Sequence, residues 1–193
     1  MKCPVTGEPN CKCTIKETYQ FDTYPKETLR KLWTDHVLYT ILLLTDMIQH
    51  TLDPDIDRLL KNQIEIGTYI GSFIGTQEGS IIVRLLTDHI HLMVDCIKSF
   101  LSNQFNEFIK VMSSIMENAT QLGSCLYRIS SNDILEEECQ KWFVTHCQHM
   151  IDLMVTLYHL DRSLRSKIID SYYNHILYVS DSIYYMVLKK YKL

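Results

Sequence analysis

Apolar side chains recur along most of this chain at intervals of three and four residues, the spacing that places them on one face of an α-helix. The first such stretch contains Leu29, Trp33, Val37, Ile41 and Leu44. Alternation at period two, which is typical of half-buried strands, is absent from the chain. The pattern therefore predicts an all-α protein.

Breaks in this apolar spacing predict six helices. They fall at Asp53-Pro54, Gly75-Thr76, Ser102-Asn103, residues 130–133 and Asp161. Proline is tolerated in the first turn of a helix, and Ser, Asn and Asp favour the position before it. We expect helices over about 22–53, 54–74, 76–101, 104–128, 133–160 and from 161 onward. Short loops between them predict an up-down bundle.

The first 22 residues differ from the rest, because they combine three cysteines with two prolines, a glycine and little periodicity. We interpret 1–22 as an irregular arm and 23–193 as the helical bundle domain. Cys3, Cys11 and Cys13 supply three thiolates for a zinc ion, but they lack the paired CxxC spacing of a zinc ribbon. A zinc site and an arm with free thiols are both open interpretations.

Length and composition fit one globular domain, with 193 residues of which 46% are hydrophobic and 22% charged. The net charge of −4 predicts no nucleic-acid partner. Seven cysteines without an apolar signal segment predict free thiols in a reduced, cytoplasmic compartment. The most apolar stretch, 37–44, is far shorter than a bilayer requires, so we expect no membrane association.

Histidine-bearing and asparagine-bearing segments repeat along the predicted helices. The asparagine-bearing segments are NQIEIG at 62–67 and NATQLG at 118–123. The histidine-bearing segments are Asp35-His36-Val37, Asp88-His89-Ile90, Gln148-His149-Met150 and Asn174-His175-Ile176. The arrangement predicts a degenerate duplication of a helix pair, and coincidence among six helices is the alternative.

Each of the four histidines, His36, His89, His149 and His175, lies among apolar neighbours at helical spacing. Buried imidazoles must find hydrogen-bond partners, and we expect these to be Asn62, Glu65, Asn118 and Gln121. Neutral imidazoles with one carboxylate also suit zinc or iron between the helices of a bundle. The candidate metal ligands are His36, Glu65, His89, His149 and His175. The alternative is a hydrogen-bonded core without metal, with His146 facing solvent.

The same motifs carry a resemblance to a family of short uncharacterised bacterial helical proteins, over residues 29–190. The matching residues are Leu32-Trp33-x-x-His36, Leu60-x-Asn62-Gln63-x-Glu65-Ile66-Gly67, Asp88-His89-Ile90, Asn118-x-x-Gln121, His149 and His175-Ile176. The resemblance implies a helical fold and attaches no activity to it. The use of Ile, Asn, Tyr and Lys also resembles that of proteins from large DNA viruses, which adds the virion as an alternative location.

Motifs of several enzyme classes are missing from the chain. It contains no GxxxxGK, GxGxxG, HExxH or GxSxG segment, so nucleotide use, zincin chemistry and a hydrolase nucleophile lack support. We therefore expect a non-enzymatic helical-bundle protein that acts through binding or scaffolding, with a protein partner or a second copy of itself. The alternative is a metalloprotein or metalloenzyme with a His/Glu site inside the bundle.

Overall fold

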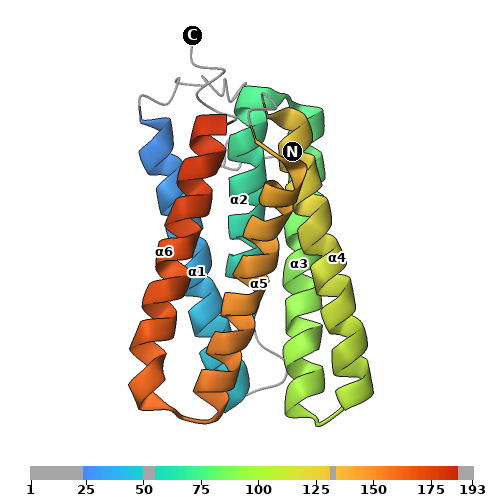
Figure 1. Cartoon of the computed structure of the whole chain (residues 1–193), viewed down its shortest axis with the longest axis vertical. Helices are drawn as coiled ribbons and strands as arrows, with labels where there is room; N and C mark the ends of the chain where they lie inside the picture. Colours follow the sequence, from blue (N-terminus) through green and yellow to red (C-terminus); the bar gives the residue numbers. More distant parts are fainter. Residues whose placement is uncertain (1–23, 50–54, 131–133, 187–193) are drawn as a thin grey trace, which may run out of the picture.

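The computed structural model describes residues 24–49, 55–130 and 134–186, and these form six α-helices without any strand. The helices are α1 (Pro25–Gln49), α2 (Asp57–Ile74), α3 (Thr76–Leu101), α4 (Phe105–Ile129), α5 (Glu136–Tyr158) and α6 (Arg162–Met186). The predicted all-α, six-helix up-down bundle is confirmed (Figure 1). The arm at 1–22, with Cys3, Cys11 and Cys13, lies outside the described residues.

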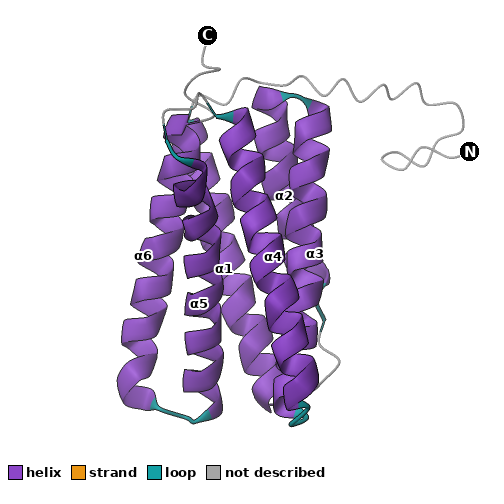
Figure 2. Ribbon diagram, turned by 45° about the vertical axis from the view of Figure 1, so that its right-hand side comes forward, coloured by secondary structure: helices purple, strands orange, loops and turns teal. Residues whose placement is uncertain are grey.

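The helices close into a ring. Each helix packs against the next along the chain, and α6 packs against α1. The helices run nearly parallel to one long axis and alternate in direction (Figure 2). The helix α1 also contacts α3 and α5 across the interior. This arrangement turns one side of α1, α3 and α5 toward a common centre.

Local sequence explains where the helices begin and end. Proline is the first residue of α1, where its missing N–H costs no hydrogen bond. Asp161 caps α6, since its Oδ1 accepts the N–H groups of Ser163 at 2.9 Å and Leu164 at 3.2 Å. The predicted break at Asp53-Pro54 lies outside the described residues.

Glycines allow two pairs of helices to pack closely. A Cβ at Gly67 of α2 would lie 2.7 Å from the backbone nitrogen of Val83 in α3. A Cβ at Gly123 of α4 would overlap the backbone of Gln140 in α5. The position in α6 at the same spacing is the fully buried Ser180. These positions follow Asn62, Asn118 and His175 by five residues each.

Candidate functional site: a buried histidine centre

Three imidazole rings meet inside the bundle: His36 of α1, His89 of α3 and His146 of α5. We call them the histidine centre. Their exposed fractions are 2%, 4% and 4%. The ring centroids of His36 and His146 are 5.2 Å apart, and those of His89 and His146 are 5.9 Å apart. The centre therefore lies in the interior, shared by the three helices that face it.

A repeated hydrogen bond positions these rings. One helical turn before each histidine, a backbone carbonyl accepts a hydrogen bond from a polar side chain of the following helix. The three bonds are Asn62 Nδ2 to Leu32 O at 3.0 Å, Asn118 Nδ2 to Leu85 O at 3.0 Å, and His175 Nε2 to Trp142 O at 2.9 Å. The two predicted pairs, α1 with α2 and α3 with α4, thus make the same hydrogen bond. The α5–α6 hairpin makes it with His175 in place of an asparagine, and His146, not the predicted His149, is the counterpart of His36 and His89.

The partner of His89 determines its tautomer. The Asn118 amide nitrogen donates to Leu85 O, so its Oδ1 is the atom that faces His89 Nδ1, at 3.1 Å. An oxygen can only accept, so Nδ1 of His89 carries the proton. The Nε2 of His89 is buried and finds no hydrogen-bond partner among the described residues.

A second set of bonds connects His36, His146 and Tyr172 of α6. The amide nitrogen of Gln63 lies 3.0 Å from His36 Nδ1 and also 3.0 Å from Leu59 O. We infer that His36 Nδ1 accepts and that its Nε2–H donates to His146 Nε2, 3.3 Å away. The Tyr172 hydroxyl lies 3.4 Å from the same His146 nitrogen. Side chains of α1, α2, α5 and α6 are thus joined through His36 and His146.

Burial keeps all three imidazoles neutral. Desolvation, the larger cause, and the nearby His89 together lower the pKa of His36 to about 3. The pKa of His89 is lowered by the same desolvation, and that of His146 lies well below its usual value. Burial also raises the pKa of the Tyr172 phenol. No carboxylate contributes to any of these shifts, so the centre offers no counter-charge to a proton.

The predicted metal ligands do not gather around one point. His36 and His89 are in the centre, but Glu65 is partly exposed and pairs with Arg58 at 3.2 Å. His149 and His175 lie half-buried at the α5–α6 seam, with ring centroids 5.1 Å apart. Across the described residues, no group of three or more His, Cys, Asp and Glu side chains is placed to hold a metal ion.

The expectation that all four histidines are buried and share one centre was therefore wrong for His149 and His175. It was also wrong for Gln121, which is exposed and bonds Glu117 instead of a histidine. The expectation that His146 faces solvent was also wrong, because its exposed fraction is 4%, and sequence reasoning missed Tyr172. A usable signal was present, because His146 precedes His175 by the same 29 residues that separate His89 from Asn118.

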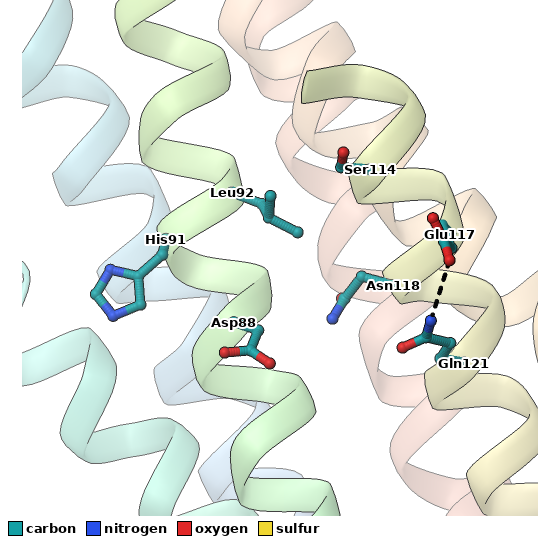
Figure 3. A pocket seen from close by; sticks show the side chains of 7 residues that line it. All are labelled: Asp88, His91, Leu92, Ser114, Glu117, Asn118 and Gln121. Atoms are coloured by element: carbon teal, nitrogen blue, oxygen red, sulfur yellow. Dashed lines mark hydrogen bonds between the residues drawn. The ribbon is translucent and has the colours of Figure 1, made fainter. Parts of the chain in front are cut away.

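An open groove of about 420 Å³ lies between α3 and α4. Asn118 projects into the space between these helices from α4 (Figure 3). Two carboxylates line the groove, and each already has a partner: Asp88 pairs with Arg84 at 3.3 Å, and Glu117 accepts from Gln121 at 3.4 Å. The exposed fraction of Asn118 is 6%, so this amide closes the floor of the groove over His89.

The four described cysteines, Cys96, Cys125, Cys139 and Cys147, are buried and unpaired by disulfides. Burial raises the pKa of Cys96 to about 11 and that of Cys147 to about 12. Such thiols stay protonated and act as small apolar side chains. In addition, none of the helices described is both long and apolar enough to cross a membrane.

Comparisons with protein-family models, curated proteins and solved structures found no match to this chain. The resemblance to a bacterial helical family therefore stays a prediction.

The pair of His89 and Asn118 allows a test of the hydrogen-bond assignment. Asn118→Leu should lower the free energy of unfolding by about 1–3 kcal/mol, because the buried Nδ1–H of His89 loses its acceptor. His89→Leu should cost less, since the ring already has one unpartnered nitrogen. The double variant should be more stable than Asn118→Leu alone. Urea unfolding at pH 8 would measure this, and additive losses would contradict the assignment.

Proposed function

We propose that this chain is a non-enzymatic helical-bundle protein that acts through binding another protein. The histidine centre supports this reading, because its imidazoles are buried and, apart from His89 Nε2 and His146 Nδ1, their ring nitrogens have hydrogen-bond partners inside the bundle. The observation that carries the proposal is a group of exposed apolar side chains at one end of the bundle, which we call the apolar end. It consists of Phe105, Ile109, Tyr158, Leu160 and Leu164, with exposed fractions between 45% and 66%.

The apolar end is formed by two neighbouring turns. The α3–α4 and α5–α6 turns lie at the same end of the bundle (Figures 1 and 2). The ring of Phe100 joins them, because its centroid is 5.8 Å from that of Phe108 and 5.1 Å from that of Tyr158. Adjacent exposed apolar side chains on a folded protein are typical of an interaction site.

Leu160 adds a second argument. It follows the end of α5 with φ of 55°, a left-handed conformation that costs a non-glycine residue about 1 kcal/mol or more. The equivalent turn after α3 has Asn103 at φ 56°, a residue type that tolerates this conformation better. An exposed leucine at a position that favours glycine suggests that the side chain serves a purpose other than folding.

Replacing Leu160 should change the stability of the fold and the binding of a partner in opposite directions. Leu160→Gly should raise the free energy of unfolding by about 1 kcal/mol, because glycine adopts positive φ without a steric penalty. The same change should weaken partner binding, since it removes an apolar contact. Urea unfolding measures the first effect. A destabilised Leu160→Gly variant would show that the leucine is needed for folding.

A photo-crosslinking amino acid would test the binding proposal in cells that express the full chain. We would place it at Leu160 or Ile109, with Glu137, exposed at the opposite end of the bundle, as the control position. The expected result is a discrete adduct from the apolar end and none from Glu137. The mass of the adduct distinguishes a second copy of this chain from another protein. Equal labelling at all three positions, or none at the apolar end, would overturn the proposal.

A further inference from the structure

Helix α6 covers the histidine centre from one side. It packs against α1 and α5, and it brings Tyr172 to within 3.4 Å of His146 Nε2. It is also the helix with the smallest buried set, because only Tyr172, Ile176, Val179, Ser180 and Ile183 are buried among its 25 residues. Its first ten residues, 162–171, include no buried side chain. Of the six helices, α6 should be the easiest to detach.

Two further imidazoles lie at the contact between α5 and α6, next to the histidine centre. The half-buried rings of His149 and His175 lie at the α5–α6 seam, and the Tyr172 ring lies between His146 and His149. Its centroid is 5.1 Å from that of His146 and 6.2 Å from that of His149. Aromatic rings thus extend from the α5–α6 seam, through Tyr172, to the histidine centre.

We propose that α6 is an acid-released cover of the histidine centre, which leaves α1 and α5 when His146 takes up a proton. A proton on His146 Nε2 would place its N–H opposite the Nε2–H of His36, donor to donor, whereas the Tyr172 hydroxyl can turn and accept. The added charge would also be buried without a counter-charge. Detaching α6 uncovers His146 and gives the imidazolium access to water.

The groups that face His146 identify it as the site that responds to pH. From α1 the facing titratable group is His36, and from α3 it is His89. From α6 they are Tyr172 and His175, and on α5 itself it is His149. From α2 and α4 the centre receives the neutral amides of Gln63 and Asn118. Every charge that protonation can add to this set is positive, so repulsion opposes a closed, protonated centre.

An ion pair at the α1–α6 contact responds in a different pH range. Asp181 of α6 accepts from Arg30 at 2.5 Å and lies 3.2 Å from Lys26 Nζ. The Arg30 and Lys26 cations lower the pKa of the Asp181 carboxyl. This pair therefore stays ionised while the imidazoles titrate. Release of α6 between pH 7 and pH 5 would be attributable to the histidines and not to Asp181.

Hydrogen exchange of the full chain, followed by mass spectrometry between pH 7 and pH 5, tests the proposal. After correction for the intrinsic pH dependence of exchange, α6 peptides should lose protection before those of α3 and α4. The exchange rate of α6 that remains after this correction should rise by up to about tenfold for each unit by which the pH falls. This is the dependence expected when opening takes up one proton. The proposal would be overturned if all helices lost protection together, if another helix lost it before α6, or if α6 did not lose it.

Variants identify the residue responsible. His146→Gln keeps a hydrogen-bonding side chain that does not titrate, so the excess pH dependence in α6 should fall at least fivefold. His91→Gln, which replaces an exposed histidine of α3, should leave that dependence unchanged. If His146→Gln does not fold, the His146 ring resonances of the wild-type chain provide the test. Their chemical shifts should change over the same pH range in which the α6 amides lose protection. Different midpoints for these two changes would contradict the proposal.

Discussion

Acidification from pH 7 to pH 4 should remove several kcal/mol of the free energy of unfolding, the largest effect that we expect. His36 has a folded pKa of about 3 against 6.5 when exposed, so the unfolded chain binds its proton first. Stability from a lowered histidine pKa is fully present above pH 6.5 and is lost as the pH falls toward the folded value. For His36 alone the loss is about 2 kcal/mol at pH 5 and about 3 kcal/mol at pH 4.

The other two imidazoles of the centre act in the same direction, because their pKa values are also lowered by burial. Stability should therefore fall with a slope above about 1.4 kcal/mol per pH unit, the value for one proton. For a domain of ordinary stability, this places acid unfolding above pH 4. The carboxyls of Asp161 and Asp181 have lowered pKa values, so their stabilising effect is lost only below pH 4.

Urea unfolding monitored by circular dichroism at several pH values would measure this slope. The double variant of His89→Leu with Asn118→Leu should reduce it, because one titrating imidazole and its amide partner are removed together. His91→Gln is the control, since this imidazole is exposed. A free energy of unfolding that stays constant from pH 7 to pH 4.5 would be incompatible with a buried, neutral histidine centre.

The second large effect concerns the contact between α4 and α5. Gly123→Val should lower the free energy of unfolding by about 3 kcal/mol or more, because its Cβ would overlap the backbone of Gln140. Backbone atoms cannot move aside as a flexible side chain can. The two helices would have to separate, which would also displace His146, one and a half turns further along α5. At an exposed position of a helix, replacing glycine by valine would instead be slightly stabilising, because glycine has the lower helix propensity.

Thermal and urea unfolding of Gly123→Val would be compared with Ser113→Val, at an exposed position of the same helix. The control substitution should change stability by less than about 1 kcal/mol. Similar values for the two variants would show that α4 and α5 do not approach each other as closely as the structure indicates. Gly67→Val should behave like Gly123→Val, because its Cβ would meet Val83 of α3.

Most of the fold could be predicted from the chain by itself. Apolar spacing is a local property, and a helix with an apolar face such as Leu29, Trp33 and Val37 must bury it against another helix. The preference of certain residues for turns is a local property as well. The predicted breaks near 53, 75, 102, 131 and 161 therefore agree with the helix bounds. The repeat of His36 with Asn62 and His89 with Asn118 could also be found, since identical residue types recur at similar spacing.

The histidine centre could be predicted only in part, and the tertiary structure decided the rest. His146 and His149 are one turn apart on α5, and either satisfies helical spacing within the accuracy of a sequence pattern. Only the rotation of α5 against α1 and α6 turns His146 inward and leaves His149 at the seam. That rotation depends on close contacts between helices, such as Gly123 with Gln140, which involve backbone atoms distant in sequence.

Whether the candidate ligands form a metal site or a hydrogen-bonded core also depends on the tertiary structure. Residue types alone allow His36, Glu65, His89, His149 and His175 to be ligands. Their positions depend on helix rotation and on competing partners: Arg58 holds Glu65 near the surface, and Trp142 O binds His175. A local pattern determines which side chains face inward, whereas the direction of each hydrogen bond depends on which neighbour the packing of six helices brings within 3 Å or so.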